Sequence, residues 1–348
     1  MWVKSSYKTV TFAQILRKTR HIGCPRKELR RWASCGKAGL PQPETKVPAH
    51  LAPDPLTTSP AVKVACITTV RNDRIFLRKW IDYYGGNFGR QSLFVIIDGL
   101  DETIPAGFEG VNFLHLRHRD WAAEVSNVPL RRVVMEHNRS RAISDLARTL
   151  WRYDYDAVIA TDVDEFLVAD PARHASLDAF IQSHKPRTAT LSGMGLDVVQ
   201  DLKSEPAIDP SQPFLAQRRV AVVSNAYTKP VLAFKPITWG AGLHRVKRRN
   251  FHIHPDLYMF HFGMIDYETA MGRANDPNLI AAGWGPHMQR RESLFRMVEA
   301  ATPTPAEPLL DDFRSRLTWK RRLLAWNKPA PLPGPPVVLI PQGLRSVL

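Results

Sequence analysis

Short apolar runs that end in polar residues constrain the fold of this chain more than any other feature. The first, residues 62–70, precedes a helical pattern over residues 75–84, which we expect to stop at Gly85 and Gly86. Three further runs have the composition of strands buried on both faces: residues 92–97, 111–116 and 157–161. A helical stretch over about residues 130–151 precedes the last of them. This alternation predicts an α/β fold with a mixed, mostly parallel sheet flanked by helices.

Polar side chains gather where these predicted strands end. Arg71, Asn72 and Asp73 follow the first strand, Asp98 follows the second, and Asp162 follows the fourth. Ligands of open α/β sheets bind at the carboxyl ends of the strands. The sequence therefore predicts one binding site at this edge of the sheet.

Three carboxylates, Asp162, Asp164 and Glu165, crowd into four residues directly after a buried strand. They would repel one another without a cation, and oxygen ligands suit magnesium or manganese. A metal held there can bridge a diphosphate and neutralise its charge as it leaves. The alternative is an acidic turn or a set of helix-capping carboxylates ahead of Phe166.

The second half of the chain has a less regular pattern. Strands are expected at residues 188–192, 219–223 and 257–262, and a helix at residues 289–300. Six prolines between Leu40 and Pro60 indicate a linker. We therefore expect a basic extension and proline-rich linker over residues 1–60, a catalytic domain over residues 61–300, and a proline-rich, basic tail over residues 301–348.

The formal net charge of +15 is concentrated near the amino terminus. Residues 1–60 hold eleven Lys and Arg against three Asp and Glu. Such a balance favours polyanions, among them an anionic membrane surface contacted by residues 1–40, although the extension could equally serve solubility alone. No nucleic-acid-binding module is recognisable, so no specific nucleic acid is expected.

The cysteines and the hydropathy pattern bear on the compartment. Three cysteines without a C-x-x-C pair favour a reducing environment over a disulfide scaffold. No stretch reaches the roughly 20 apolar residues that cross a bilayer, and the basic start lacks the apolar region of a signal peptide. A cytoplasmic protein, peripheral at the inner face of the membrane at most, is expected.

Several motifs together resemble glycosyltransferase family 2, in the D-x-D-E-F branch that is similar to the family 92-like enzymes. The matching segments are residues 68–73, 80–84, 97–101 and 161–167. The resemblance covers roughly two-thirds of the chain. It implies a GT-A fold, inversion at the sugar carbon and a UDP- or GDP-linked sugar donor. Residues 99–100 are less polar than the family pattern at that place.

The resemblance also implies roles for particular residues. The nucleotide pocket would be lined by residues of the first strand and its end, namely Thr68, Val70, Arg71 and Asn72. Asp98 would contact the base or ribose. Asp162 and Asp164 would hold Mn²⁺ or Mg²⁺ and the diphosphate.

The remaining candidates come from later segments and from the helix before the D-x-D strand. Asp197 follows a strand-like run and is the candidate general base, with a plain loop acid as the alternative. His244 and His261 are candidate metal ligands, or else histidines satisfied within the core. Arg141, or Arg139 on the same helix, and Lys235 are candidate phosphate contacts, or else surface cations. His252 and His254 alternate on a predicted strand, a spacing that can also bind metal.

These observations predict a metal-dependent, inverting hexosyltransferase with a place in polysaccharide biosynthesis and a saccharide, lipid-linked or protein acceptor. A dehalogenase-type phosphatase needs Thr or Val where Phe166 stands. A nucleotidyltransferase would use similar metal chemistry, but a glycine-rich phosphate loop is missing at the first strand. The other class that stays open is a basic nucleic-acid- or membrane-surface-binding protein with an inactive GT-A-like core.

Overall fold

The computed structural model describes residues 61–348, apart from 105, 247–251, 320, 323–324, 332 and 335. The described residues from Val62 onward belong to one compact unit, Val62–Leu348. The expectations for residues 1–60, including the membrane contact, lie outside the described residues. Among the described residues, no helix combines the length and apolar composition that spanning a bilayer requires.

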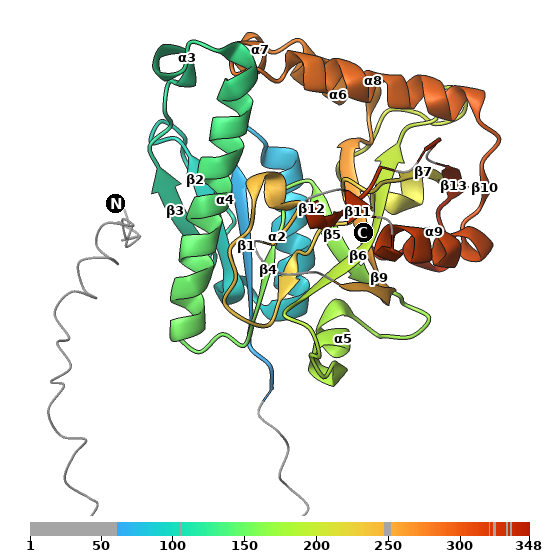
Figure 1. Cartoon of the computed structure of the whole chain (residues 1–348), viewed down its shortest axis with the longest axis horizontal. Helices are drawn as coiled ribbons and strands as arrows, with labels where there is room; N and C mark the ends of the chain where they lie inside the picture. Colours follow the sequence, from blue (N-terminus) through green and yellow to red (C-terminus); the bar gives the residue numbers. More distant parts are fainter. Residues whose placement is uncertain are drawn as a thin grey trace, which may run out of the picture. The chain divides into compact units, whose positions relative to one another are not determined.

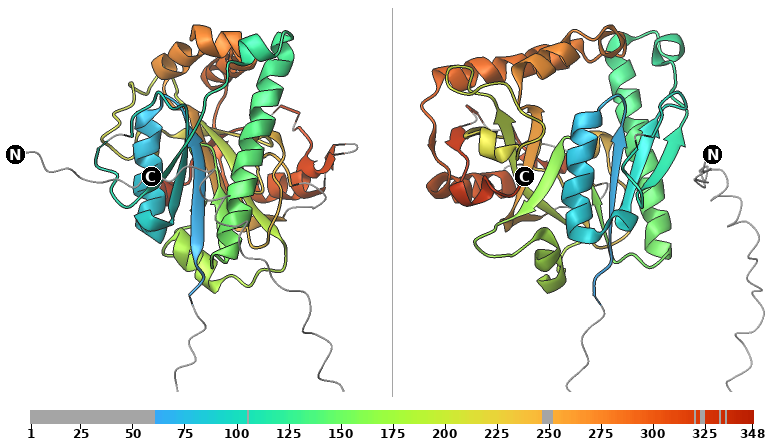
Figure 2. Two further views of the ribbon diagram at one scale, coloured as in Figure 1. Left: turned by 90° about the vertical axis from the view of Figure 1, so that its left-hand side faces the viewer. Right: turned by 180° about the vertical axis from the view of Figure 1, so that it is seen from behind.

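The first half of the unit is a three-layer arrangement around parallel strands. The strands lie in the order β4-β1-β2-β3, all parallel. Helix α2 covers one face of these strands and α4 covers the other (Figures 1 and 2). The elements are β1 (Val64–Val70), α2 (Arg74–Phe88), β2 (Leu93–Asp98), β3 (Asn112–Leu116), the short α3 (Trp121–Glu124), α4 (Val128–Arg152) and β4 (Ala157–Ala160).

Helix α2 continues through the two glycines, Gly85 and Gly86, at which we predicted its end. It is capped instead by Gly89, whose φ of 79° lies in the left-handed region and whose N–H bonds the Gly85 carbonyl. Trp80 and Tyr84 are fully buried on this helix. Their packing outweighs the roughly 1 kcal/mol that each glycine costs inside a helix.

The second half turns the sheet into a mixed one. Its full order is β10-β13-β7-β6-β8-β4-β1-β2-β3, with β9 pairing to both β5 and β6. Hence the predicted α/β class is confirmed, with parallel strands in the first half and antiparallel pairs joining most of the rest. The added strands are β5 (Glu165–Ala169), β6 (Thr190–Val199), β7 (Val220–Val223), β8 (Leu232–Ala233), β9 (His252–Met264), β10 (Thr304–Pro305) and β13 (Val337–Leu339), and β11 (Arg321–Arg322) and β12 (Ala325–Pro329) form a separate pair.

Strand β9 lies between β5 and β6, and its pairing with both aligns a row of polar side chains across the three strands. His261 is opposite Glu165 of β5 in the antiparallel pair and opposite Asp197 of β6 in the parallel pair. Asp197 therefore lies within a strand and is 4% exposed, whereas we predicted it to follow a strand. The row starts at Glu165, the first residue of β5, shortly after the end of β4.

Helices α6 (Tyr267–Ala274), α7 (Pro277–Ala281) and α8 (Gly285–Ala300) lie together at the end of the molecule where β1 ends (Figure 1). Helix α5 (Leu177–Ser183) lies toward the opposite end. Residues 301–348 are not a separate tail, because α9 (Glu307–Trp319) packs on β9 and β13 pairs with β7. Buried Leu310, Leu317 and Val338 join them to the main core.

Candidate functional site

The acidic segment is fixed in place by the buried end of β4 and the start of β5. The indole N–H of Trp80 on α2 donates to Thr161 Oγ1 at 2.9 Å, between two fully buried side chains. A turn follows, in which the Glu165 N–H bonds the Asp162 carbonyl at 3.1 Å. Asp164 lies within this turn, and its carbonyl accepts from the Phe262 N–H of β9 at 2.9 Å. The turn therefore presents Asp162 and Asp164 at the carboxyl edge of the parallel strands, as predicted.

Two cations neutralise Asp162 and Glu165. Lys229, with a side chain 2% exposed, places its Nζ 2.5 Å from Glu165 Oε1 and 3.1 Å from Asp162 Oδ2. Arg139 of α4 places its Nη1 3.1 Å from Asp162 Oδ1. Burial would raise the pKa of Asp162, but the charges of Arg139 and Lys229 outweigh it and lower that pKa. Burial would likewise lower the pKa of Lys229, but the two carboxylates raise it, so the ammonium stays charged.

A second cluster surrounds His261. Its Nδ1 is 2.8 Å from Asp197 Oδ1, and its Nε2 is 3.4 Å from Asp164 Oδ2. The ring stacks on Tyr227, with centroids 3.7 Å apart. Arg291 of α8 reaches both Asp197 oxygens, at 3.1 and 3.2 Å, and bonds the Tyr227 hydroxyl. The imidazole is thus fixed on three sides, and its Nε2 faces the D-x-D segment.

The pKa values in this cluster follow from the same contacts. Burial would raise the pKa of Asp164, but His261 and Arg273 outweigh it and lower that pKa. Burial and Arg291 would lower the pKa of His261, yet Asp164 and Asp197 raise it. Asp164 is therefore ionised at neutral pH.

A cavity of about 660 Å³ opens at the ends of β1 and β2, against α6. Val70 and Asn72, two of the residues predicted to contact a nucleotide, line it, and so do Asp73 and, from α6, Arg273. Asn72 has a φ of 55°, a conformation that asparagine tolerates well, and its N–H bonds Glu102 Oε1 at 2.8 Å. The cavity adjoins the acidic segment, since Arg273 reaches Asp164.

The other residues predicted for the nucleotide are held in different ways. Thr68 is fully buried in β1, and its Oγ1 has no hydrogen-bond partner among the described residues. Arg71 donates to the Asp98 carbonyl at 2.6 Å and pairs with Asp101. The Asp98 carboxylate lies 3.1 Å from His118 Nδ1. Their contacts with a base or ribose stay predictions.

Three further candidates are Arg141, Lys235 and His244. Arg141 is exposed on α4, and Arg139 is the arginine of this helix that reaches Asp162. Lys235 is exposed, whereas Lys229 occupies the buried position beside the acids. His244 has its Nδ1 2.8 Å from the Ala226 carbonyl. Their phosphate and metal contacts stay predictions.

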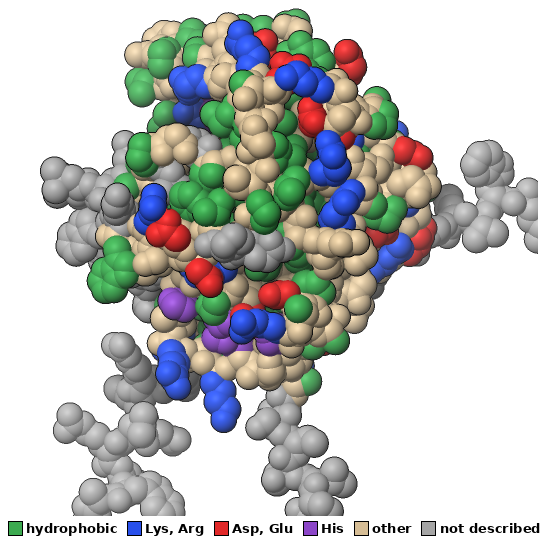
Figure 3. Space-filling model, turned by 90° about the vertical axis from the view of Figure 1, so that its right-hand side faces the viewer, with side chains coloured by type: hydrophobic (Ala, Val, Ile, Leu, Met, Phe, Trp, Pro, Cys, Tyr) green, Lys and Arg blue, Asp and Glu red, His purple; other side chains and the backbone are tan. Residues whose placement is uncertain are grey.

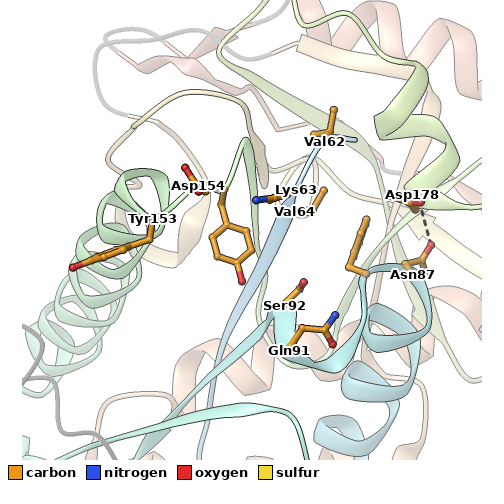
Figure 4. Close-up of a pocket in the computed structure, with 11 residues that line it drawn as sticks. Val62, Lys63, Val64, Asn87, Gln91, Ser92, Tyr153, Asp154 and Asp178 are labelled. Carbon is orange, nitrogen blue, oxygen red and sulfur yellow. Dashed lines mark hydrogen bonds between the residues drawn. The ribbon is translucent and has the colours of Figure 1, made fainter. Parts of the chain in front are cut away.

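A second cavity, of about 520 Å³, lies at the opposite end of β1 (Figure 4). Lys63, Gln91, Ser92 and Tyr153 are among its lining side chains. It adjoins Val62, where the compact unit begins, and none of the predicted site residues lines it. We therefore place the candidate site at the carboxyl edge.

A histidine cluster lies on the outer part of β9 and near α5, and histidines gather at the lower edge of the face in Figure 3. The rings of His252 and His254 are 6.1 Å apart, so they share a face as predicted. His184 lies 5.4 Å from His254, and His174 Nε2 is 3.1 Å from Asp256 Oδ2. Burial lowers the pKa of His254 to about 4, so this ring is neutral at pH 7.

The residues around Asp164 fit a divalent metal in part. Among the described residues, no three His, Cys, Asp or Glu side chains converge closely enough to form a metal site by themselves. However, His261 has the orientation of a metal-bound histidine, with Nδ1 on a carboxylate and Nε2 toward a second one. A Cβ at Gly263 would be 2.9 Å from His261 Nε2 and 3.3 Å from Asp164 Oδ2, so glycine leaves space beside these two atoms, which Arg291 and Arg273 also approach. Magnesium is often bound by one or two carboxylates completed by substrate phosphates, which suits this arrangement.

Comparison with known proteins gives little beyond the geometry. No family model matches the chain, and no curated protein matches it. Among solved structures, the chain is similar to the mannosyltransferase PcManGT from Pyrobaculum calidifontis in complex with GDP-Man and Mn²⁺. The match has 15% identity and a TM-score of 0.29, and covers 78% of this chain and 84% of that one. A superposition at this level supports no argument about activity, so the function proposed below rests on the site itself.

Sequence reasoning missed several residues that complete the site: Lys229, Tyr227, Arg273 and Arg291. The two arginines lie on α6 and α8, and their residue type alone does not separate them from arginines on a helix surface. Lys229 has one local signal of burial in the sequence, since it stands between Thr228 and Pro230 just ahead of a short apolar run. Only the pairing of distant strands and helices brings these cations to the acids.

Proposed function

We propose that this chain is a glycosyltransferase that takes a nucleotide-sugar donor together with a divalent metal. The observation that carries the proposal is the contact between Asp164 and His261 at the carboxyl edge of the sheet, beside a cavity of about 660 Å³. Cavities of this size take small molecules and cofactors. The resemblance of the D-x-D-E-F segment to glycosyltransferase family 2 supports the same reaction, with inversion at the sugar carbon and a hexose as the transferred group.

Each residue of the site has a part that its contacts suit. Asp164 and His261 Nε2 would hold Mn²⁺ or Mg²⁺. Asp162 Oδ1, which lies 3.1 Å from Arg139 Nη1, would be the next oxygen that the metal could recruit. When bound, such a metal supplies positive charge to the diphosphate as it leaves. Lys229 and Arg139 keep Asp162 ionised and in place.

The role of Asp197 changes from the one that the sequence indicated. Arg291 binds both of its oxygens, and Oδ1 also faces His261 Nδ1. A general base must reach the acceptor hydroxyl directly or through one water. The contacts of Asp197 favour a positioning role, in which it orients His261, over the predicted role as base. The donor nucleotide, UDP or GDP, and the saccharide, lipid-linked or protein acceptor stay open.

The proposal is tested with a panel of UDP- and GDP-sugars and Mn²⁺, by following release of the nucleoside diphosphate. We expect turnover or hydrolysis of at least one donor, loss of it with a chelator, and a fall of about 100-fold for Asp164→Asn. Asp311→Asn is the matched control, because that carboxylate is 85% exposed on α9. Binding of Mn²⁺ in the presence of the nucleoside diphosphate, measured by calorimetry, should weaken in the same variant. If no donor is bound or turned over, the alternative of an inactive core in a basic binding protein replaces this proposal.

A further inference from the structure

Arg273 connects the cavity to the acidic segment. It belongs to α6, which begins shortly after β9 and is capped by the Asp266 side chain on the Thr269 N–H. Its guanidinium pairs with Asp73 at the end of β1, and its Nη1 lies 3.6 Å from Asp164 Oδ2. The group also lies over the ring of Phe76, 5.1 Å from the centroid. These contacts hold a positive charge between the two acids.

Arg273 differs from the other three cations of the site in what it faces. The side chains of Lys229 and Arg291 are 2% and 12% exposed and are enclosed by the carboxylates that they neutralise. Arg139 is shared by Glu136 and Asp162. Only Arg273 of these four lines the cavity, together with Thr269 and Gly272 of the same helix, and its side chain is 27% exposed. It is therefore the cation of the cluster that a molecule in the cavity can contact, beside the exposed Arg74 of α2, which also lines the cavity.

A guanidinium binds phosphate oxygens in the same paired geometry that it uses for a carboxylate. A diphosphate carries more negative charge than the single carboxylate of Asp73. Asp73 supplies one carboxylate to Arg273 and also caps α2 by accepting from the Phe76 N–H. An anion with several negative oxygens can therefore compete with Asp73 for Arg273, while Asp73 keeps its bond to the helix.

We propose that Arg273 is a phosphate-binding residue of this cavity and takes the diphosphate of a nucleoside-diphosphate donor. The identity of that donor rests on the proposed function, but the anion site itself does not. Because Arg273 also lies beside Asp164, a diphosphate bound to it would lie next to the carboxylate that we assign to the metal. In this arrangement Asp73 acts as a competitor that holds the guanidinium in position.

Binding of inorganic pyrophosphate to the full chain, measured by calorimetry with a chelator present, tests the proposal. Arg273→Gln should weaken binding about tenfold or more. Arg290→Gln, which removes the same charge from an exposed position on α8, should leave it within about twofold. Asp73→Asn should bind pyrophosphate several-fold more tightly, since an amide can still cap α2 but no longer competes as an anion.

Three outcomes would overturn the proposal: no pyrophosphate binding by the unaltered chain, equal binding by Arg273→Gln, or equal weakening by Arg290→Gln. If Arg273→Gln does not fold, Asp73→Asn decides alone, and unchanged or weaker binding by it counts against the proposal. Failure of sugar transfer with an intact Arg273-dependent affinity would reject the proposed function and keep the anion site. If sugar transfer survives Arg273→Gln with an unchanged donor KM, the anion site is rejected and the proposed function is kept.

Discussion

Replacing Lys229 by Met tests whether the acidic cluster is held together by its own buried cations. The Nζ of Lys229 lies 2.5 Å from Glu165 and 3.1 Å from Asp162, and the Lys229 and Glu165 side chains are 2% and 0% exposed. Methionine keeps most of the volume and removes the charge. Among the described residues, buried Glu165 then has no cation in contact, and Asp162 keeps Arg139 alone. Removing one partner of a buried ion pair costs about 3–5 kcal/mol, because the other charge is left without compensation.

The loss is measured by thermal and urea unfolding of the full chain. At roughly 2–4 °C for each kcal/mol in a domain of this size, the midpoint should fall by about 10 °C. Adding Glu165→Gln to Lys229→Met removes the stranded charge. The double variant should therefore be more stable than the sum of the two single losses predicts, by about 1–3 kcal/mol.

Arg290→Met is the matched control, since Arg290 is an exposed cation on α8. It should change stability by less than about 0.5 kcal/mol. The reasoning is refuted if Lys229→Met costs less than about 1 kcal/mol, or if the losses of the two single variants simply add.

Two further predictions concern β9. Gly263→Ala should weaken Mn²⁺ binding, measured in the presence of a nucleoside diphosphate, by about 10–100-fold. The reason is that the new Cβ would lie 2.5 Å from His261 Cε1, while Tyr227 and Asp197 restrict any shift of the ring. A metal affinity equal to that of the unaltered chain would contradict this prediction. The histidine cluster should make stability depend on pH. Burial lowers the pKa of His254 in the folded chain to about 4, against about 6.5 in the unfolded chain. The unfolded chain therefore binds more protons between these values, and stability falls as pH drops from 6.5 to 4. We expect a loss of about 1–2 kcal/mol in the free energy of unfolding, less than the full pKa shift would give, because the ring is only half-buried. Urea unfolding at pH 7 and pH 5 should show a shallower pH dependence for His254→Gln. Identical pH profiles for the two proteins would count against this prediction.

The first half of the fold could be predicted because its signals are local. Buried parallel strands have continuous apolar composition, and each of the four expected runs is a strand in the structure. The placement of Asp162 and Asp164 after β4 followed from the same pattern. The stop at Gly85 was wrong because tertiary packing of Trp80 and Tyr84 outweighs the glycine penalty.

The second half depends on pairing between distant segments, which one sequence does not specify. Strand β5 was not predicted, since Glu165–Ala169 is only five residues long and pairs with β9, nearly a hundred residues later. The same pairing brings His261 beside Glu165 and Asp197. His261 could be nominated from the sequence by its residue type, but its partners Arg291 and Tyr227 could not. The expected tail failed for a related reason, because three residues of β13 gain their stability from pairing with β7.

The pairing of β9 with two neighbours limits how this chain can change in length. His261 is aligned with Glu165 on one side and with Asp197 on the other, and side chains alternate along a strand with a period of two. A single residue inserted or deleted between Leu257 and His261 would turn the imidazole to the opposite face and break both alignments at once. Insertions at the exposed residues 209–213, in the connection between β6 and β7, leave the row intact. Evolution can therefore lengthen and reshape that connection, while changes within β9 are confined to substitutions that keep its register.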